Sequence, residues 1–167
     1  LAKELQGGGY TLLVIDTISR ALGAVDQMDQ AAMNVTMGLL QRLAIDNNVT
    51  LLAVDHHRKA AGSVSDVIDD VMGATSKASV ADAVLGLYRQ RGQKESTLKI
   101  TGRDVEDVEL AIELDSKILC WQYLGKADDV RAETIQSAII DAIDEKGGQA
   151  TTKELAEHLR KSPAQIS

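Results

Sequence analysis

Two short apolar runs, each followed by an aspartate, constrain the fold of this chain more than any other feature. Residues 11–15 (TLLVI) precede Asp16, and residues 50–54 (TLLAV) precede Asp55. Continuous runs of aliphatic side chains are typical of strands buried on both faces of a parallel sheet. The segment between the runs has the three- and four-residue apolar spacing of a helix that buries one face. That face consists of Ala32, Met33, Met37, Leu40, Leu43 and Ala44. Strand, helix and strand in this order predict a βαβ unit with parallel strands.

The segments that follow predict further strands. Residues 83–88 (AVLGLY) indicate a third buried strand. Shorter and more polar strands are expected at 97–102, 109–115 and 118–123. In the second of these, Leu110, Ile112 and Leu114 alternate with Glu109, Ala111, Glu113 and Asp115. A period of two residues is typical of a strand with one face in water. The predicted fold class is therefore α/β, with the parallel strands extended by an antiparallel hairpin.

The C-terminal part of the chain has helical patterns. AETIQSAIIDAIDEKGG predicts an amphipathic helix that ends at Gly147 and Gly148. Thr151 and Glu154 form a capping-box pattern for a second helix. SPAQ places Ser162 and Pro163 at the start of a third. We therefore expect two domains, a core over residues 1–125 and the start of a helix-turn-helix or winged-helix domain over 126–167. Because the chain opens on a helix tail and stops after a helix-start signal, we expect a fragment of a longer protein.

Composition excludes several classes of protein. The chain is 44% hydrophobic and 26% charged, as in ordinary soluble proteins. A net charge of -7 argues against wholesale wrapping of nucleic acid and leaves room only for a local basic patch. The single cysteine, Cys120, excludes a disulfide framework and indicates a reducing cytoplasm. No apolar run approaches the roughly 20 residues of a membrane span.

Polar side chains follow the first two predicted strands. Asp16 ends the first strand, at the edge where open α/β sheets bind ligands. A carboxylate there can hold Mg²⁺, and the alternative is an aspartate that caps the following loop or helix. His56 and His57 stand at the same place on the second strand. Neighbouring strand residues point to opposite sides, so the two imidazoles are not expected to bind one ion together. The alternative for them is a pair of ordinary loop histidines.

Two further segments carry weaker signals. Arg103 follows the strand TLKITG, where an arginine can reach across a subunit boundary to a phosphate. The alternative is a surface arginine paired with Asp104 or Glu106. Residues 73–79 (GATSKAS) predict either a flexible loop or the lining of a phosphate or DNA path. Lys77, within that segment, is a weak signal by itself.

Four stretches in order carry a resemblance to a known family. They are YTLLVIDTIS, LLAVDHHRK, MGATSKASVADAVLGLYR and LKITGRDVEDVELAIELD. Together they resemble the second half of a RecA-like ATPase core, and more narrowly the hexameric replicative helicases of the DnaB and plasmid RepA types with their RadA-like relatives. The resemblance covers roughly residues 1–123 and identifies the first stretch as the Walker B strand.

The resemblance implies a nucleotide-binding motor that acts on DNA in replication or repair. ATP and Mg²⁺ are the implied cofactors of the parent protein, with Asp16 as the metal ligand and Thr17 and His57 beside the nucleotide. His56 is implied as the sensor of the γ-phosphate, and Arg103 as an arginine finger. The implied parent is a homo-oligomer, a hexameric ring on single-stranded or duplex DNA, and its winged-helix tail would guide it to DNA.

The sequence departs from that family in important places. It contains no GxxxxGK[ST] phosphate loop, and the family's catalytic glutamate belongs upstream. Met72 stands where relatives often have Arg, and Thr101 where many helicases have Lys. An isolated chain of this sequence is therefore not expected to hydrolyse ATP.

Two other functions compete with the motor hypothesis. VDHHR also resembles the signature of the DHH phosphoesterases, which use Asp and His to bind two Mn²⁺ or Mg²⁺ ions. That family needs an upstream carboxylate pair, and here only Asp16 precedes the signature within a strand. The other alternative is a non-enzymatic DNA-binding module, which residues 130–167 alone would support.

Overall fold

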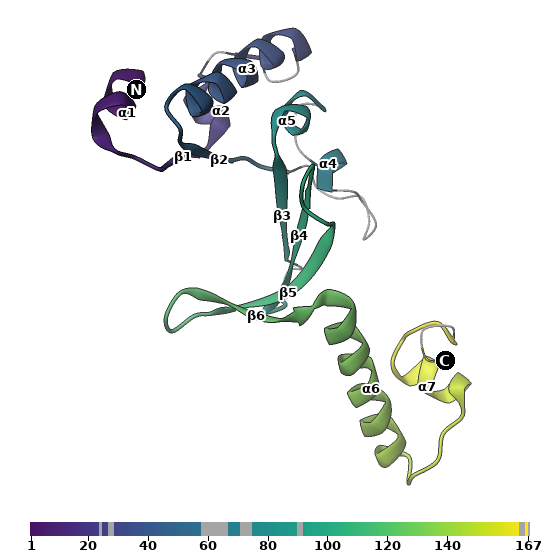
Figure 1. Cartoon of the computed structure of the whole chain (residues 1–167). Coiled ribbons are helices and arrows are strands. Elements are labelled where there is room, and N and C mark those ends of the chain that lie inside the picture. Colours follow the sequence, from purple (N-terminus) through teal and green to yellow (C-terminus); the bar gives the residue numbers. More distant parts are fainter. Residues whose placement is uncertain are drawn as a thin grey trace. The chain divides into compact units, whose positions relative to one another are not determined.

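The computed structural model describes residues 1–23, 25–26, 29–57, 67–70, 75–89, 92–163 and 166. It divides into two compact units. The first comprises Leu1–Gly86 with Ile100–Asp107, and the second comprises Leu87–Lys99 with Val108–Ser167. The described strands form a two-stranded sheet, ordered β1-β2, and a four-stranded sheet, ordered β3-β4-β5-β6 (Figure 1). This mixture of sheets and helices confirms the α/β fold class.

The elements have the following bounds. The helices are α1 (Ala2–Gly8), α2 (Ile18–Ala21), α3 (Gln30–Asp46), α4 (Val67–Asp70), α5 (Thr75–Val80), α6 (Ala127–Glu145) and α7 (Thr152–His158). The strands are β1 (Leu12–Asp16), β2 (Thr50–Val54), β3 (Ala83–Arg89), β4 (Glu95–Gly102), β5 (Val108–Asp115) and β6 (Cys120–Lys126). Within the described residues, no helix is both long and apolar enough to cross a bilayer.

The predicted βαβ unit is present in the first compact unit. β1 and β2 are parallel, with a register that pairs Leu12 with Thr50 and Asp16 with Val54. The crossover helix α3 begins at Asp29, whose carboxylate accepts hydrogen bonds from the amides of Ala31 and Ala32. α3 then runs beside the strand pair (Figure 1). The carboxyl ends of the two strands therefore lie at the same edge of the sheet.

A small apolar core holds this unit together. Its fully buried side chains are Ile18 of α2 and Met33 of α3, and Met37 is nearly so. The partly buried side chains packed against them are Ile15, Leu22, Val25, Leu40, Ala53 and Val80. The predicted face of α3 is thus confirmed, because each of its members is buried or half-buried. Methionine suits such a core, since its unbranched side chain fills irregular gaps.

The prediction that the strands are buried on both faces is wrong. β1 and β2 alternate between half-buried and exposed positions, and Leu12, Val14, Leu52 and Val54 lie on the exposed face. An apolar side chain is buried only where another element covers it, and here α2 and α3 cover one face. The same holds for residues 83–88, where Leu85 and Leu87 of β3 are exposed. An apolar run indicates a strand but does not say how many of its faces are covered.

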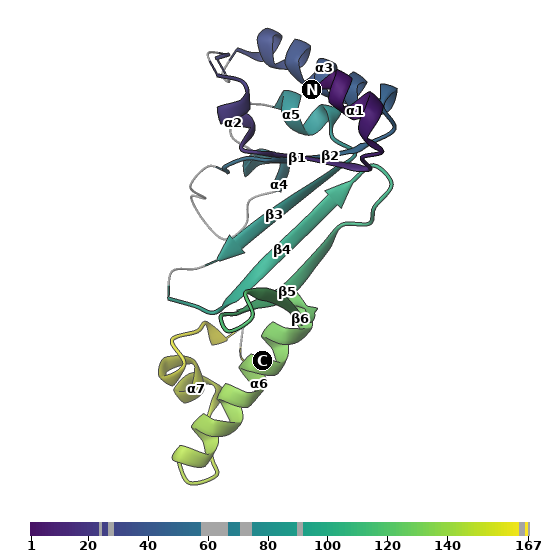
Figure 2. The same ribbon diagram turned by 90° about the vertical axis from the view of Figure 1, so that its left-hand side faces the viewer.

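The four-stranded sheet contains the more polar strands. β3 belongs to this sheet and runs opposite to β4 (Figure 2). β5 and β6 are antiparallel, with a register shift between Ala111 and Ile112, which pair with Gly125 and Tyr123. The extra residue of this β-bulge, Leu124, lies on β6, so β5 keeps its two-residue period. Ala111 and Ile112 point to opposite faces and are both buried, so both faces of β5 are covered at this point. The expectation that Ala111 lies on the wet face is therefore wrong.

Charged side chains connect α6 to this sheet. Lys99 of β4 forms an ion pair of 2.9 Å with Glu109 of β5, and its ammonium lies 5.6 Å from the centre of the Tyr88 ring. Arg131 of α6 reaches the other carboxylate oxygen of Glu109 at 3.6 Å. Because one carboxylate serves cations from two elements, the start of α6 is oriented on the sheet.

The helical C-terminal segment follows the predicted pattern. α6 ends at Glu145, and the Gly148 amide donates to the Ile143 carbonyl at 2.9 Å, a contact that needs the positive φ of Gly147. α7 begins with the predicted capping box of Thr151 and Glu154. The predicted third helix stays a prediction, because residues 164 and 165 lie outside the described residues. The boundary proposed at residue 125 is likewise a prediction.

The capping box makes α7 sensitive to acid. Hydrogen bonds from the backbone and the hydroxyl of Thr151 lower the pKa of Glu154 below its ordinary value of 4.5. A lowered pKa means that the folded state favours the ionised carboxylate, so its stabilisation is fully present above about pH 4.5. It is lost as the pH falls through the lowered pKa. We expect the Thr151 amide resonance to titrate with a midpoint below 4.5.

A matched variant on the same helix controls this experiment. Glu154→Gln should abolish the titration of the Thr151 amide, whereas Glu157→Gln should leave it in place. A midpoint above 4.5, or the same midpoint in the Glu154→Gln protein, would contradict the capping-box assignment.

Candidate functional site

The shared edge of β1 and β2 carries the first predicted site residues. Asp16 is the last residue of β1, and its side chain is exposed. Thr17 follows through a cis peptide bond, has an extended conformation and precedes α2. Its hydroxyl lies 2.9 Å from that of Ser19. Thr17, and not Asp16, occupies the N-cap position of α2, so the alternative that Asp16 caps this helix is not supported.

Beyond β2, the same edge carries Asp55 and His56. The register pairs Asp16 with Val54, so the residues after Val54 extend past the end of β1. One carboxylate oxygen of Asp55, Oδ1, accepts a hydrogen bond of 2.9 Å from the His56 amide. The other, Oδ2, forms an ion pair with Nζ of Lys77. The side chains of Asp55 and Lys77 are only 17% and 6% exposed, so this pair is largely shielded from water.

Sequence reasoning missed the role of Lys77. Residues 75–79 belong to helix α5, so the expectation of a flexible loop is wrong over that range. Met72, Gly73 and Ala74 lie outside the described residues. A buried lysine needs a partner, and Asp55 lies 22 positions earlier in the sequence. No local pattern relates residues so far apart. The one available signal was a lysine within a short segment of small residues.

The two histidines at this edge are both exposed. His56 is fixed through its backbone amide, while His57 forms an isolated β-bridge. Across the described part of the chain, no three His, Cys, Asp or Glu side chains gather closely enough to hold a metal ion. Asp55, the first residue of the DHH string, already pairs with an ammonium group. A cation in that position repels a metal ion, which weakens the phosphoesterase alternative.

Arg103 lies directly after β4 and is 57% exposed. Its guanidinium donates a hydrogen bond of 2.6 Å to the Ser79 carbonyl, and its amide donates one of 3.0 Å to the Asp82 carbonyl. A longer contact of 4.0 Å joins Nη1 to the Asp82 carboxylate. The ion pairs of the described residues therefore connect Arg103 to Asp82, and not to Asp104 or Glu106 as the alternative required.

The residues at the edge fit a magnesium ion. Mg²⁺ prefers hard oxygen donors and retains several waters, so it needs only one or two protein ligands. Asp16 offers an exposed carboxylate, and no described residue forms an ion pair with it. The Thr17 hydroxyl lies next along the chain. Asp55 is less suitable as a ligand, because Lys77 neutralises its charge.

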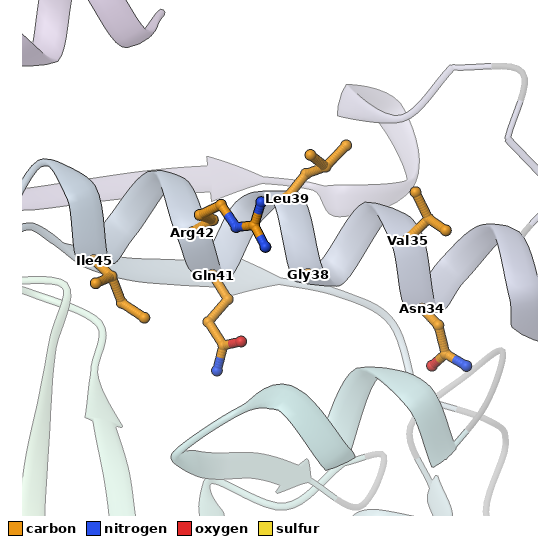
Figure 3. Close-up of a pocket in the computed structure, with 7 residues that line it drawn as sticks. All are labelled: Asn34, Val35, Gly38, Leu39, Gln41, Arg42 and Ile45. Atoms are coloured by element: carbon orange, nitrogen blue, oxygen red, sulfur yellow. The ribbon is translucent and has the colours of Figure 1, made fainter.

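A depression in the first unit lies apart from this edge. It has a volume of about 330 Å³ and is formed by the outward side of α3 (Figure 3). Its lining residues are Asn34, Val35, Gly38, Leu39, Gln41, Arg42 and Ile45. None of the predicted site residues belongs to it.

Comparison with known proteins found a family model that matches the N-terminal part of the chain. Residues 1–62 match the family model of the AAA domain. The matched segment contains β1, α3, β2 and the residues Asp16, Asp55 and His56. This part of the chain is therefore similar to an AAA-type ATPase region, a class of nucleotide-binding proteins. No curated protein matches the sequence.

The Asp55–Lys77 pair has a testable energetic consequence. Lys77→Met removes one partner and leaves a largely buried carboxylate without its cation. We expect a loss of about 3 kcal/mol, the lower end of the range for broken buried pairs, because Asp55 is partly exposed. Denaturant unfolding of the chain measures this change.

Two variants control the measurement. The double variant Asp55→Asn with Lys77→Met removes both charges and should lose less stability than Lys77→Met alone. Lys153→Met removes an exposed charge on α7 and should change stability by no more than about 0.5 kcal/mol. Equal losses for Lys77→Met and Lys153→Met would contradict the burial of the pair.

Proposed function

We propose that residues 1–125 form part of a RecA-like motor ATPase that acts on DNA, of the hexameric replicative helicase type. The observation that carries the proposal is the shared edge of β1 and β2, where Asp16 and His56 stand at the ends of neighbouring parallel strands. Open α/β sheets bind their ligands at that edge. The edge also lies within the segment similar to an AAA domain.

In this proposal each side chain at the edge has a separate role in phosphoryl transfer. Such reactions depend on positioning and on neutralising charge more than on covalent chemistry. Asp16 would hold Mg²⁺, which neutralises charge on the β- and γ-phosphates when bound. Thr17 and His57 would lie beside the nucleotide. His56 would contact the γ-phosphate, and its fixed backbone amide supports such a sensing role because a sensor must be held in place.

Arg103 would act on the site of a neighbouring subunit. Its side chain is more than half exposed although two hydrogen bonds hold the residue, so Arg103 is positioned yet open to solvent. Planar guanidinium groups bind phosphate oxygens in pairs. In a homo-oligomeric ring, each subunit would supply Arg103 to the nucleotide of the next one.

DNA is the proposed substrate of the motor, in unwinding, replication or repair. The helices α6 and α7 contact each other and would begin a winged-helix or helix-turn-helix domain that guides the motor to DNA. The basic residues near the end of the chain, Lys153, Arg160 and Lys161, are few, so phosphate contacts from the described part would be few as well. The winged-helix tail would thus have an accessory role.

The first experiment concerns the phosphate loop. Because the chain has no GxxxxGK[ST], we expect purified chain to show no ATP hydrolysis above a buffer control. The reading frame upstream of Leu1 should encode that motif within about 100 residues, and the longer polypeptide should hydrolyse ATP in the presence of Mg²⁺. A full-length reading frame without the motif would rule out the ATPase.

A mixing experiment with the longer polypeptide tests the assigned roles. Asp16→Asn and Arg103→Gln should each lower ATP hydrolysis by about a thousandfold or more. When the two inactive proteins are mixed, some sites combine Asp16 of one subunit with Arg103 of another. Random mixing would restore about a quarter of the sites of a head-to-tail ring.

The control for this experiment is Arg131→Gln. Arg131 is also about half exposed but pairs with carboxylates on β5 and α6, so its replacement should leave hydrolysis unchanged. Absence of any recovery on mixing would show that Arg103 does not act between subunits.

A further inference from the structure

Within the first unit, helix α5 contacts both the segment that carries His56, the proposed sensor, and Arg103, the proposed arginine finger. At Lys77 it forms the buried ion pair with Asp55, whose carboxylate also holds the His56 amide. At Ser79 its carbonyl accepts a hydrogen bond of 2.6 Å from Arg103. Only one residue separates these two positions. One short helix therefore connects the sensor end of β2 with the arginine after β4.

The contacts on the sensor side constrain His56 through Asp55. The Asp55 carboxylate uses Oδ1 for the His56 amide and Oδ2 for Lys77. A movement of Lys77 rotates or releases that carboxylate, and the His56 amide then loses its acceptor. Since the Lys77 side chain is only 6% exposed, water cannot readily replace Lys77 as the partner of Asp55. The ion pair of α5 and the hydrogen bond of the His56 amide thus share one carboxylate.

The contacts on the arginine side are equally close. The Arg103 amide donates to the Asp82 carbonyl at 3.0 Å. At Gly102, an added Cβ would lie 2.6 Å from that same carbonyl oxygen, so a larger side chain could not fit there without displacing the backbone. The tip of β4 is therefore pressed against the turn that connects α5 to β3. A displacement of Arg103 must disturb this turn.

The end of α5 is anchored as well. α5 packs against α3, and Val80 contacts the apolar core around Ile18, Met33 and Met37. A short helix held by packing moves as one piece, so a change at Ser79 is transmitted to Lys77. In a helix that was not held by packing, local flexibility would absorb the change at Ser79 before it reached Lys77.

We infer that Lys77 is a positioning residue for His56, and that α5 transmits the state of Arg103 to it. The inference rests on the proposed function, in which His56 senses the nucleotide of its own subunit and Arg103 that of its neighbour. When Arg103 engages a neighbouring phosphate, it gives up the Ser79 carbonyl. α5 then shifts, and the Asp55–Lys77 pair carries the shift to the sensor. Neighbouring nucleotide sites would be coupled through this helix.

The test follows the His56 amide by NMR in the ¹⁵N-labelled chain, without nucleotide. Arg103→Gln should move the His56 amide resonance and speed its hydrogen exchange by about fivefold, the lower end of the range for coupled sites. In the double variant Asp55→Asn with Lys77→Met, adding Arg103→Gln should produce no further change at His56. The double variant removes both charges together, so neither is left without the other.

Arg131→Gln is the matched control, because Arg131 is 53% exposed, belongs to the other compact unit and likewise loses a charge. It should leave the His56 amide unchanged. An unchanged His56 in Arg103→Gln would overturn the inference. So would an equal response in Arg131→Gln, or a response that persists without the Asp55–Lys77 pair.

The result is separable from the proposed function, because this measurement uses no ATP. If Arg103 and His56 are coupled but the longer polypeptide does not hydrolyse ATP, the α5 connection is supported and the proposed motor function is wrong. If the longer polypeptide hydrolyses ATP but Arg103 and His56 are not coupled, the motor function is supported and the α5 connection is wrong.

Discussion

The parallel register of β1 and β2 is the constraint on which the rest of the first unit depends. A crossover helix of 17 residues, α3, brings the second strand back beside the first in the same direction. Parallel pairing then places Asp16 and the residues after Val54 at one edge. The core of Ile18, Met33 and Met37 holds α2 and α3 against that strand pair. Without this register the acidic and imidazole side chains would lie at unrelated places on the surface.

One carboxylate, that of Asp55, fixes the geometry of this edge. Asp55 divides its two oxygens between a backbone amide and an ammonium group, and both partners are thereby oriented. A largely buried ion pair contributes little net stability when compared with apolar packing, but breaking it is costly. Such a pair therefore serves to fix geometry more than to hold the fold together. Here it fixes the segment that carries His56.

Much of the local structure followed from short-range patterns. Val, Leu and Ile runs predicted β1 and β2 within one residue, and the spacing around Met33 and Met37 predicted the buried face of α3. Thr151 and Glu154 predicted their own capping box, because both partners lie within one helical turn. The shared edge of Asp16 and His56 followed from the βαβ rule. These features need only neighbouring residues or a well-established connection rule.

Other features escaped prediction because they depend on distant contacts. The exposed sides of Leu12 and Val14 depend on which elements cover the sheet, and the burial of Ala111 depends on cover over the second face of β5. Gly73–Ser79 resembled a flexible loop because small polar residues favour no particular element. Packing of α5 against α3 decided in favour of a helix over its described part.

The sequence by itself determined the order of the six strands and of the helices α3, α6 and α7, the parallel strand pair, and the presence of Asp16 and His56 at strand ends. Those properties arise from periodicity, capping and chain connectivity, which act over a few residues. Only the tertiary structure decided that Lys77 pairs with Asp55 and that Arg103 bonds to the turn after α5. In water, a charged side chain can pair with any of many partners, because the alternative ion pairs have similar free energies. Burial selects one of them, and burial is a property of the whole packed unit.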